Sequence, residues 1–178
     1  MKKMSHNILI TGSPGSGKTT LVEKLLHQIP DKKGFITREV RQSGKRTGFE
    51  IVTPDGERKL LAGVGIDSPY RVSKYKVDVG GFETVLDRFF YVTDKDVLYI
   101  DEIGKMELFS GKFKKLVQLY LEADNLFIAT IALKSTDDFI RDIKKRDDID
   151  LFTIDRNNRD TMYRNLSATI SQNNSTIK

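Results

Sequence analysis

A short segment near the N-terminus combines glycines, a lysine and a threonine at a spacing suited to hold phosphate. Residues 12–19 read GSPGSGKT and match the pattern G-x-x-x-x-G-K-[ST] at every fixed position. Glycines let the backbone form a concave nest of N–H groups, and the helix after such a loop points its positive end at the same anion. The Lys18 ammonium can bind the β- and γ-phosphates, and the Thr19 hydroxyl can coordinate Mg²⁺. We predict nucleotide binding by Gly12, Ser13, Pro14, Gly15, Ser16, Gly17, Lys18, Thr19 and Thr20.

Two adjacent acids, Asp101 and Glu102, follow the apolar run at residues 97–100. In proteins with this kind of loop, an acid at the end of a neighbouring strand holds Mg²⁺, and Asp101 fits that role. Glu102 would point beyond the γ-phosphate, where it could orient and deprotonate an attacking water, a role worth about 10²–10⁴-fold in rate. The alternative reading of Glu102 is a solvated surface carboxylate. Because a kinase has no use for a base that activates water, the pair favours hydrolysis over transfer to an acceptor.

Three cations later in the chain are candidates for a role at the γ-phosphate. Lys134 follows an expected strand at residues 126–133, where a polar residue could sense that phosphate; an ordinary exposed lysine is the alternative. Arg156 and Arg159 lie between an expected strand and helix, on the side where α/β sites form. Either could stabilise charge in the transition state, or serve only in helix capping and salt bridging. An arginine from a neighbouring subunit is also left open.

The hydrophobic pattern places these residues on alternating strands and helices. We expect strands at residues 7–11, 97–100, 126–133 and 151–154, and helices at residues 19–28, 82–91, 110–122, 136–146 and 157–170. Short strands separated by turns, at residues 35–37, 48–52 and 59–61, predict a β-meander. The interval between Lys18 and Asp101 has room for this meander and at least one further strand between the loop strand and the acid strand. The pattern predicts an α/β fold, in which a mostly parallel sheet is covered by helices on both faces and the meander is inserted after the first helix.

Composition limits the classes of protein that this chain can represent. Its 178 residues predict a single domain over residues 1–172 with a frayed polar tail at 173–178. The absence of cysteine excludes disulfides and zinc–thiolate sites and fits a reducing cytoplasm. We expect neither a signal peptide nor a membrane-spanning segment, since no apolar run approaches the roughly 20 residues that a span requires. A net charge of +5 suits anionic partners, but it is the only support for nucleic-acid binding. The sequence leaves the oligomeric state open.

Several segments together resemble one family. They are the loop itself, GFITREVR at residues 34–41, RTGF at 46–49, IDEIGKME at 100–107 and NRD at 158–160. Over essentially the whole chain they resemble the small nucleoside-triphosphatases that include the cancer-related nucleoside-triphosphatase. The resemblance implies a RecA-like three-layer P-loop fold and slow, Mg²⁺-dependent hydrolysis of several nucleoside triphosphates. It also implies nucleotide contacts around Leu98, Tyr99, Ile100, Asp101, Glu102, Ile103, Gly104 and Lys105.

We therefore expect a Mg²⁺-dependent nucleoside triphosphatase with loose base selectivity, because no segment reads as a base-specific pocket. A nucleotide or small-molecule kinase is the first alternative. It would carry an arginine-rich lid and place phosphate on an added acceptor. A nucleic-acid-binding motor or switch is the second alternative, and nucleic acid would then stimulate its hydrolysis many-fold.

Overall fold

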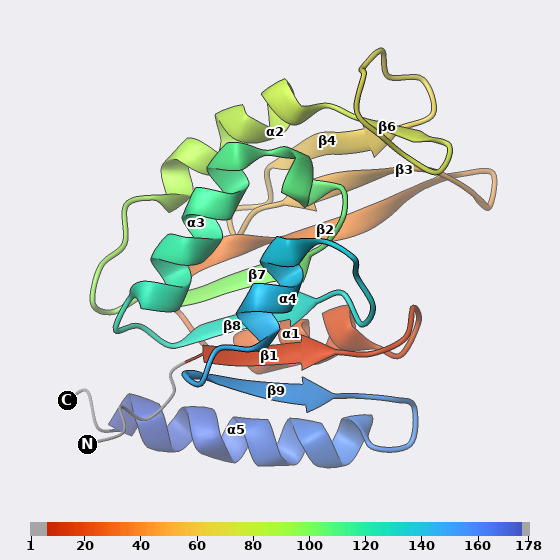
Figure 1. Cartoon of the computed structure of the whole chain (residues 1–178). Helices are drawn as coiled ribbons and strands as arrows, with labels where there is room; N and C mark the ends of the chain where they lie inside the picture. The colour runs from red at the N-terminus through yellow and green to blue at the C-terminus, as the bar shows by residue number, and fades with distance from the viewer. Residues whose placement is uncertain (1–6, 176–178) are drawn as a thin grey trace.

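A single mixed sheet forms the middle layer of the protein (Figure 1). The computed structural model describes residues 7–175. The strands are β1 (Asn7–Thr11), β2 (Lys32–Gln42), β3 (Lys45–Val52), β4 (Arg58–Gly63), β5 (Arg71–Val72), β6 (Tyr75–Val77), β7 (Val97–Ile103), β8 (Phe127–Ile131) and β9 (Ile149–Thr153). They lie in the order β5-β6-β4-β3-β2-β7-β8-β1-β9.

The sheet has a parallel part and an antiparallel part. Strands β2, β7, β8, β1 and β9 run parallel, so their carboxyl ends meet at one edge. Strands β3, β4, β6 and β5 continue the sheet from β2 in antiparallel pairs. The predicted meander corresponds to β2, β3 and β4, and β6 and β5 extend it. The strand between β1 and β7 is β8, which follows the acid strand in the chain. The interval from Lys18 to Asp101 therefore supplies no strand between them, contrary to our expectation, because its strands all lie on the far side of β7.

Helices cover both faces of the sheet, as the pattern predicts (Figure 1). One face carries α2 (Val79–Leu86), α3 (Gly111–Glu122) and α4 (Asp138–Lys144), and the other carries α1 (Lys18–Leu26) and α5 (Arg159–Ser175). Helix α2 begins earlier than expected because Asp78 caps it, accepting a hydrogen bond from the Gly81 N–H at 2.9 Å. No helix in the described range is both long enough and apolar enough to cross a bilayer.

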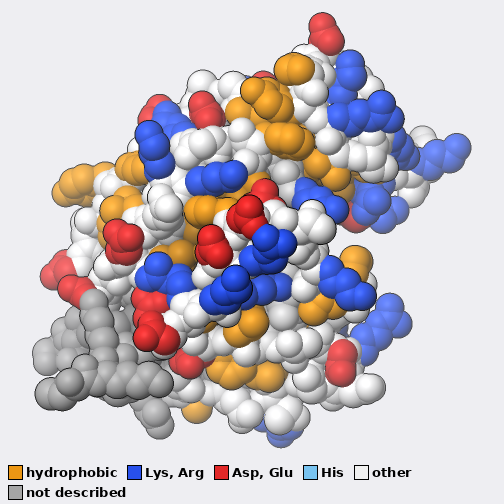
Figure 2. Space-filling view, in the orientation of Figure 1, with side chains coloured by type: hydrophobic (Ala, Val, Ile, Leu, Met, Phe, Trp, Pro, Cys, Tyr) orange, Lys and Arg blue, Asp and Glu red, His pale blue; other side chains and the backbone are white. Residues whose placement is uncertain are grey.

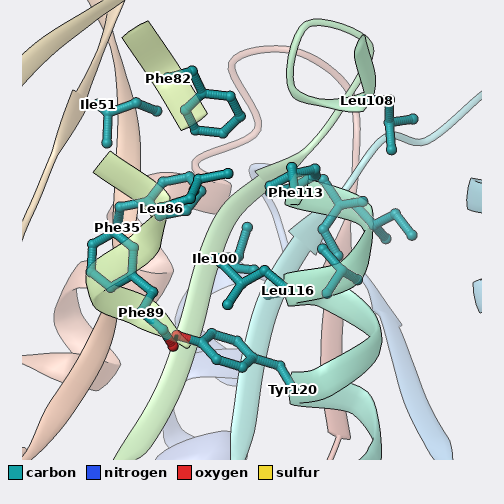
Figure 3. Packing of buried hydrophobic residues seen from close by; sticks show 14 of the residues in the cluster. Phe35, Ile51, Phe82, Leu86, Phe89, Ile100, Leu108, Phe113, Leu116 and Tyr120 are labelled. Carbon is teal, nitrogen blue, oxygen red and sulfur yellow. Dashed lines mark hydrogen bonds between the residues drawn. The ribbon is translucent and has the colours of Figure 1, made fainter. Parts of the chain in front are cut away.

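The core consists of two hydrophobic clusters separated by the sheet. In β1, Leu9 belongs to the cluster under α2–α4, whereas Ile8 and Ile10 belong to the cluster under α1 and α5. Both alternating sets are apolar because a parallel strand in the middle of the sheet is buried on both faces. Figure 3 shows the first cluster, where the Phe35 ring packs edge-on against Phe82 with centroids 5.8 Å apart. These clusters fix the strands whose ends carry the site.

The C-terminal helix is longer than predicted. Helix α5 continues to Ser175, past the expected end at residue 170. Residues 176–178 of the predicted frayed tail lie outside the described residues. The assignment of residues 1–172 to one domain stays a prediction.

Candidate active site

The loop between β1 and α1 forms an anion-binding nest. Gly15 and Gly17 have φ angles of +75° and +95°, a left-handed conformation that glycine adopts without strain. A Cβ on Gly12 would lie 2.4 Å from the Ile154 carbonyl oxygen, so the loop can approach β9 only with glycine there. Within the described part of the chain, no side chain caps the N-terminus of α1. The first N–H groups of α1 and its positive dipole end therefore face the loop, where a phosphate would be stabilised.

Two cations lie against this loop. The Lys18 ammonium donates hydrogen bonds to the carbonyl oxygens of Gly12 and Ser13, at 3.0 and 3.3 Å. The Arg159 side chain packs on the loop, since a Cβ on Gly17 would meet its Cδ and Nη1 at 2.7 Å each. The Arg159 Nε is buried and has no hydrogen-bond partner among the described residues; the Asp160 carboxylate is 4.0 Å away. The structure thus brings Arg159 to the loop predicted to bind phosphate.

Asp101 lies near the carboxyl end of β7. Strand β8 separates β7 from β1, the strand that leads into the loop. Its side chain is buried, and one carboxyl oxygen accepts a hydrogen bond from the Thr130 hydroxyl of β8. The other oxygen, Oδ2, is buried without a hydrogen-bond partner among the described residues. Burial raises the pKa of Asp101, while the Thr130 and Thr19 hydroxyls and the Lys18 charge oppose that rise. An unpartnered carboxylate oxygen near a threonine hydroxyl is a donor set that suits a hard divalent cation such as Mg²⁺.

Glu102 follows Asp101 and lines the same cavity as the loop. The pairing between β7 and β8 shifts register between Ile100 and Ile103, across the two acids. Burial raises the pKa of Glu102, the Asp101 charge raises it further, and the Lys18 ammonium opposes both effects. A carboxylate whose pKa is moved toward neutrality is a better acceptor of a proton from water.

The loop and the two acids line one cavity of about 750 Å³, within the usual size range of small-molecule sites. Its walls consist of Gly12, Ser13, Pro14, Gly15, Lys18, Thr19, Thr37, Glu39, Arg46, Phe49, Val72, Asp101, Glu102, Lys105, Met106, Glu107, Ala132, Leu133 and Lys134. In the space-filling view, the outline is notched on the side of the strand ends, between the antiparallel strands and the loop (Figure 2). The cavity therefore joins the predicted phosphate site to a wall built by the antiparallel strands.

The predicted site residues separate into those that line the cavity and those that do not. The cavity is lined by most of the loop, by both acids, by Lys105 and by Lys134. Ser16 is buried, and Thr20 is exposed on α1. Arg156 is exposed and does not line the cavity. Gly17, Gly104 and Arg159 do not line it either, although the Arg159 side chain packs on Gly17. The role of each of these residues in nucleotide binding stays a prediction.

Four residues assigned to nucleotide contact by resemblance lie instead in the core. Leu98, Ile100 and Ile103 are buried in the cluster under α2–α4, and Tyr99 is buried in the cluster on the other face. None of the four lines the cavity. The two-residue period of β7 directs Leu98, Tyr99 and Ile100 alternately into the two hydrophobic layers. Ile103 departs from this alternation, because the strand is irregular between Ile100 and Ile103. These residues position Asp101 and Glu102 rather than face the cavity.

Part of the cavity wall was not predicted. Thr37 and Glu39 come from β2, and Arg46, Phe49 and Val72 come from the antiparallel strands β3 and β5. Their approach to the loop depends on how distant strands pair, and no local pattern reports it. Some of the groups at the site did leave a signal. Thr130 is a polar residue in an apolar strand, and Glu107 lies within the IDEIGKME segment that carries the resemblance. Thr37 and Glu39 lie in GFITREVR, and Arg46 and Phe49 lie in RTGF, two further segments that carry it.

Comparisons with known proteins agree with this geometry. The family model described as NTPase matches residues 7–167. The nucleoside-triphosphatase THEP1 of Thermotoga sp. (strain RQ2) is 43% identical over 170 residues, which cover 93% of this chain and 96% of that protein. The human cancer-related nucleoside-triphosphatase is 35% identical over 174 residues, covering 88% of this chain and 92% of that protein. The crystal structure of THEP1 from the hyperthermophile Aquifex aeolicus matches with a TM-score of 0.80 and 36% identity, over 90% of this chain and 96% of that one.

A phosphate-binding loop, an acid-tipped neighbouring strand and a sheet covered on both faces define an α/β P-loop nucleotide-binding protein. The family model and the relatives narrow that class. The chain belongs to the NTPase family. This result confirms the resemblance and the fold class predicted from the sequence.

Proposed function

We propose that the protein hydrolyses nucleoside triphosphates to the diphosphate and inorganic phosphate, with Mg²⁺ as its cofactor. The observation that carries this proposal is the placement of Glu102 in one cavity with Lys18 and the loop. Membership of the NTPase family supports the same activity. Hydrolysis requires a phosphate cradle, charge compensation and a base beside the attacking water, and this cavity offers a residue for each.

The nest and α1 would bind the phosphates, and Lys18 would compensate charge on the β- and γ-phosphates. Thr19 and Asp101 would hold Mg²⁺, which when bound neutralises charge on the phosphate oxygens. Glu102 accepts a proton from water while the water oxygen bonds to the γ-phosphorus. The bond from that phosphorus to the β–γ bridging oxygen breaks, and the diphosphate carries away its electron pair. Arg159, whose side chain packs on Gly17 of the loop, would compensate charge as this bond breaks.

The same geometry favours loose base selectivity. The groups assigned here act on phosphates, which all nucleoside triphosphates share. Around the loop, the other lining residues at the tip of β8 are Ala132, Leu133 and Lys134, which offer apolar contact and a single cation. A phosphate-release assay with ATP, GTP, CTP and UTP, with and without Mg²⁺, tests this part of the proposal. Turnover of one base alone, or turnover without a divalent cation, would contradict it.

The variant Glu102→Gln tests the role of the base. It removes the proton acceptor but keeps size and polarity, so nucleotide affinity should be nearly intact while turnover falls by about 10²-fold or more. Glu122→Gln is the control, because Glu122 is exposed on α3 and does not line the cavity. Unchanged turnover in Glu102→Gln would eliminate Glu102 as the base.

One observation favours a kinase as a second candidate. Besides Glu102, the cavity is lined by the apolar side chains of Phe49, Val72 and Met106, whereas hydrolysis needs room beside the phosphates for only a single water. Turnover in ¹⁸O-labelled water separates the two reactions. Hydrolysis places the label in released phosphate, whereas transfer to an added acceptor leaves the phosphoryl group unlabelled.

Another observation bears on a nucleic-acid-stimulated ATPase. Lys and Arg side chains gather on the face seen in Figure 2, over the end of the molecule formed by the β2–β3 hairpin and β5–β6. Addition of single- or double-stranded DNA or RNA at low and high salt provides the test. Many-fold stimulation that disappears as salt rises would favour this function, since phosphate contacts release counterions.

A further inference from the structure

The Glu107 side chain is a buried acid in the cavity wall that the proposed mechanism does not use. Glu107 begins the short 3-10 turn Glu107–Phe109 that follows β7. Its side chain lines the cavity, and the residue is only 4% exposed. The Thr37 hydroxyl of β2 donates a hydrogen bond to its Oε1 at 3.1 Å. One carboxyl oxygen is thus fixed by the neighbouring strand, and the other remains to face a different group.

The other oxygen, Oε2, lies beside Gly104, as does the Glu102 carboxyl group. A Cβ built on Gly104 would lie 2.7 Å from Glu102 Oε1 and 3.1 Å from Glu107 Oε2. The two carboxyl groups therefore both lie against Gly104, on the side where a side chain would project. Gly104 leaves the room in which the two acids can approach each other.

Two carboxylates this near each other would repel if both were charged. No Lys, Arg or His in the described range forms an ion pair with Glu107. The charged groups that face it are Glu102 and Asp101 of β7. Burial and then the Glu102 charge raise the pKa of Glu107 to about 8; hydrogen bonds from its own backbone and from Thr37 oppose this rise, and the Asp101 charge adds a smaller increase. Glu107 therefore keeps its proton at neutral pH and can donate it in a hydrogen bond.

We propose that Glu107 is a positioning residue: it hydrogen-bonds the Glu102 carboxylate across Gly104 and holds it in the orientation in which it deprotonates water. This inference rests on the role proposed above for Glu102. Thr37 orients Glu107, Glu107 orients Glu102, and Glu102 faces the γ-phosphate site. The chain of contacts connects the meander strand β2 to the chemistry of the loop.

Two substitutions at position 107 test whether Glu107 acts as a hydrogen-bond donor or only packs in the cavity wall. Glu107→Leu fills the space but cannot donate, so Glu102 is released and kcat at pH 7 should fall at least about tenfold, with nucleotide affinity nearly unchanged. Glu107→Gln keeps an N–H donor toward Glu102 and an oxygen toward Thr37, so it should restore kcat to within about threefold of the wild type. Glu83→Gln is the control, since Glu83 is half-buried beside the same turn and accepts from the Ser110 hydroxyl at 2.7 Å, outside the cavity.

The pH profile of kcat distinguishes positioning from a merely structural role. In the wild type, kcat should fall as the pH rises past about 8, because Glu107 ionises there and repels Glu102. Glu107→Gln cannot ionise and should lose this alkaline limb. The proposal is overturned if Glu107→Leu keeps wild-type kcat, if Glu107→Gln is as impaired as Glu107→Leu, or if Glu107→Gln retains the alkaline limb.

Failure of this inference can be told from failure of the proposed function. If Glu102→Gln turns over normally, the base assignment is wrong whatever position 107 does. If Glu102→Gln is inactive while Glu107→Leu is not, the base stands and only the positioning role is lost. Thermal melting of each variant at pH 7 shows whether it is folded, and binding of a fluorescent nucleotide analogue shows whether the loop is intact.

Discussion

Gly104→Ala displaces the proposed base without removing any functional group. The new methyl would lie 2.7 Å from Glu102 Oε1, and no contact below 3.4 Å is ordinary for a Cβ. The carboxylate must therefore withdraw by about 0.7 Å, and misplacement by about 1 Å in a catalytic group can cost 10²-fold. We expect kcat to fall by between about tenfold and 100-fold, equivalent to about 1.4–2.7 kcal/mol in the activation barrier. Nucleotide affinity should change little, because the loop and α1 are untouched.

Gly104→Ala should lower kcat while leaving the free energy of unfolding almost unchanged. The methyl meets only side-chain atoms, Oε1 and Cγ of Glu102 and Oε2 of Glu107. Because these flexible side chains can rotate away, we expect the free energy of unfolding to stay within about 1 kcal/mol of the wild type. Gly111→Ala is the matched control: nothing lies within 4 Å of its Cβ, so the same substitution should leave kcat unchanged. The assay is phosphate release at saturating ATP and Mg²⁺, with melting followed by circular dichroism. Wild-type kcat in a folded Gly104→Ala protein would refute the placement of the two carboxyl groups or their role.

The remaining predictions concern cations, metal and pH. Lys18→Ala loses a charge-assisted contact and should weaken both nucleotide binding and turnover by about tenfold to 100-fold, measured by calorimetry and phosphate release; full activity would contradict the loop assignment. Arg159→Ala should lower kcat by at least about tenfold while Arg156→Ala leaves it unchanged, and equal effects would refute a special role for Arg159. Thr130→Val removes the hydroxyl that donates to Asp101 and should raise the Mg²⁺ concentration for half-maximal turnover; an unchanged Mg²⁺ requirement would contradict Asp101 as the ligand. Because folding raises the pKa of Glu107 from 4.5 to about 8, the stability due to its protonated form is complete below pH 4.5 and is lost as the pH rises to 8. The melting temperature of the wild type, measured relative to that of Glu107→Gln, should fall between pH 4.5 and 8. A difference in melting temperature that stays constant over this pH range would contradict the prediction.

The phosphate side of the site was predictable from sequence because its geometry is local. The loop needs glycines at fixed spacing before a helix, and Asp101 and Glu102 needed only an apolar run to place them at a strand end. The residues of β7 show why a resemblance that covers a whole segment does not identify which of its side chains face the site. Resemblance assigned nucleotide contact to the whole stretch, whereas the alternation of a buried strand turns Leu98 and Ile100 into the core.

The opposite wall of the cavity depends on pairing between distant strands. Phe49 and Val72 reach the site because β3 and β5 extend the sheet beyond β2, and strands as short as β5 carry no usable periodicity. For the same reason, we expected the strand between β1 and β7 to come from the interval between Lys18 and Asp101, whereas it is β8, which follows β7 in the chain. Hydrophobic patterning identifies strands and buried faces, but the order of the strands in a sheet comes from the packing of the whole chain.

The strand order determines whether Glu102 has room beside it for an attacking water. Because β8 lies between β1 and β7, the loop and the acid strand are separated by two strand spacings, about 10 Å. Direct pairing of β7 with β1 would halve this gap and bring the acids against the phosphates themselves, leaving no room for a cation beside Asp101 and a water beside Glu102. In the observed order, Thr130 of the intervening strand holds Asp101 in the gap. The residue after the metal-binding acid can act on water only in a sheet ordered this way, so the base assigned to Glu102 depends on topology as much as on its carboxylate.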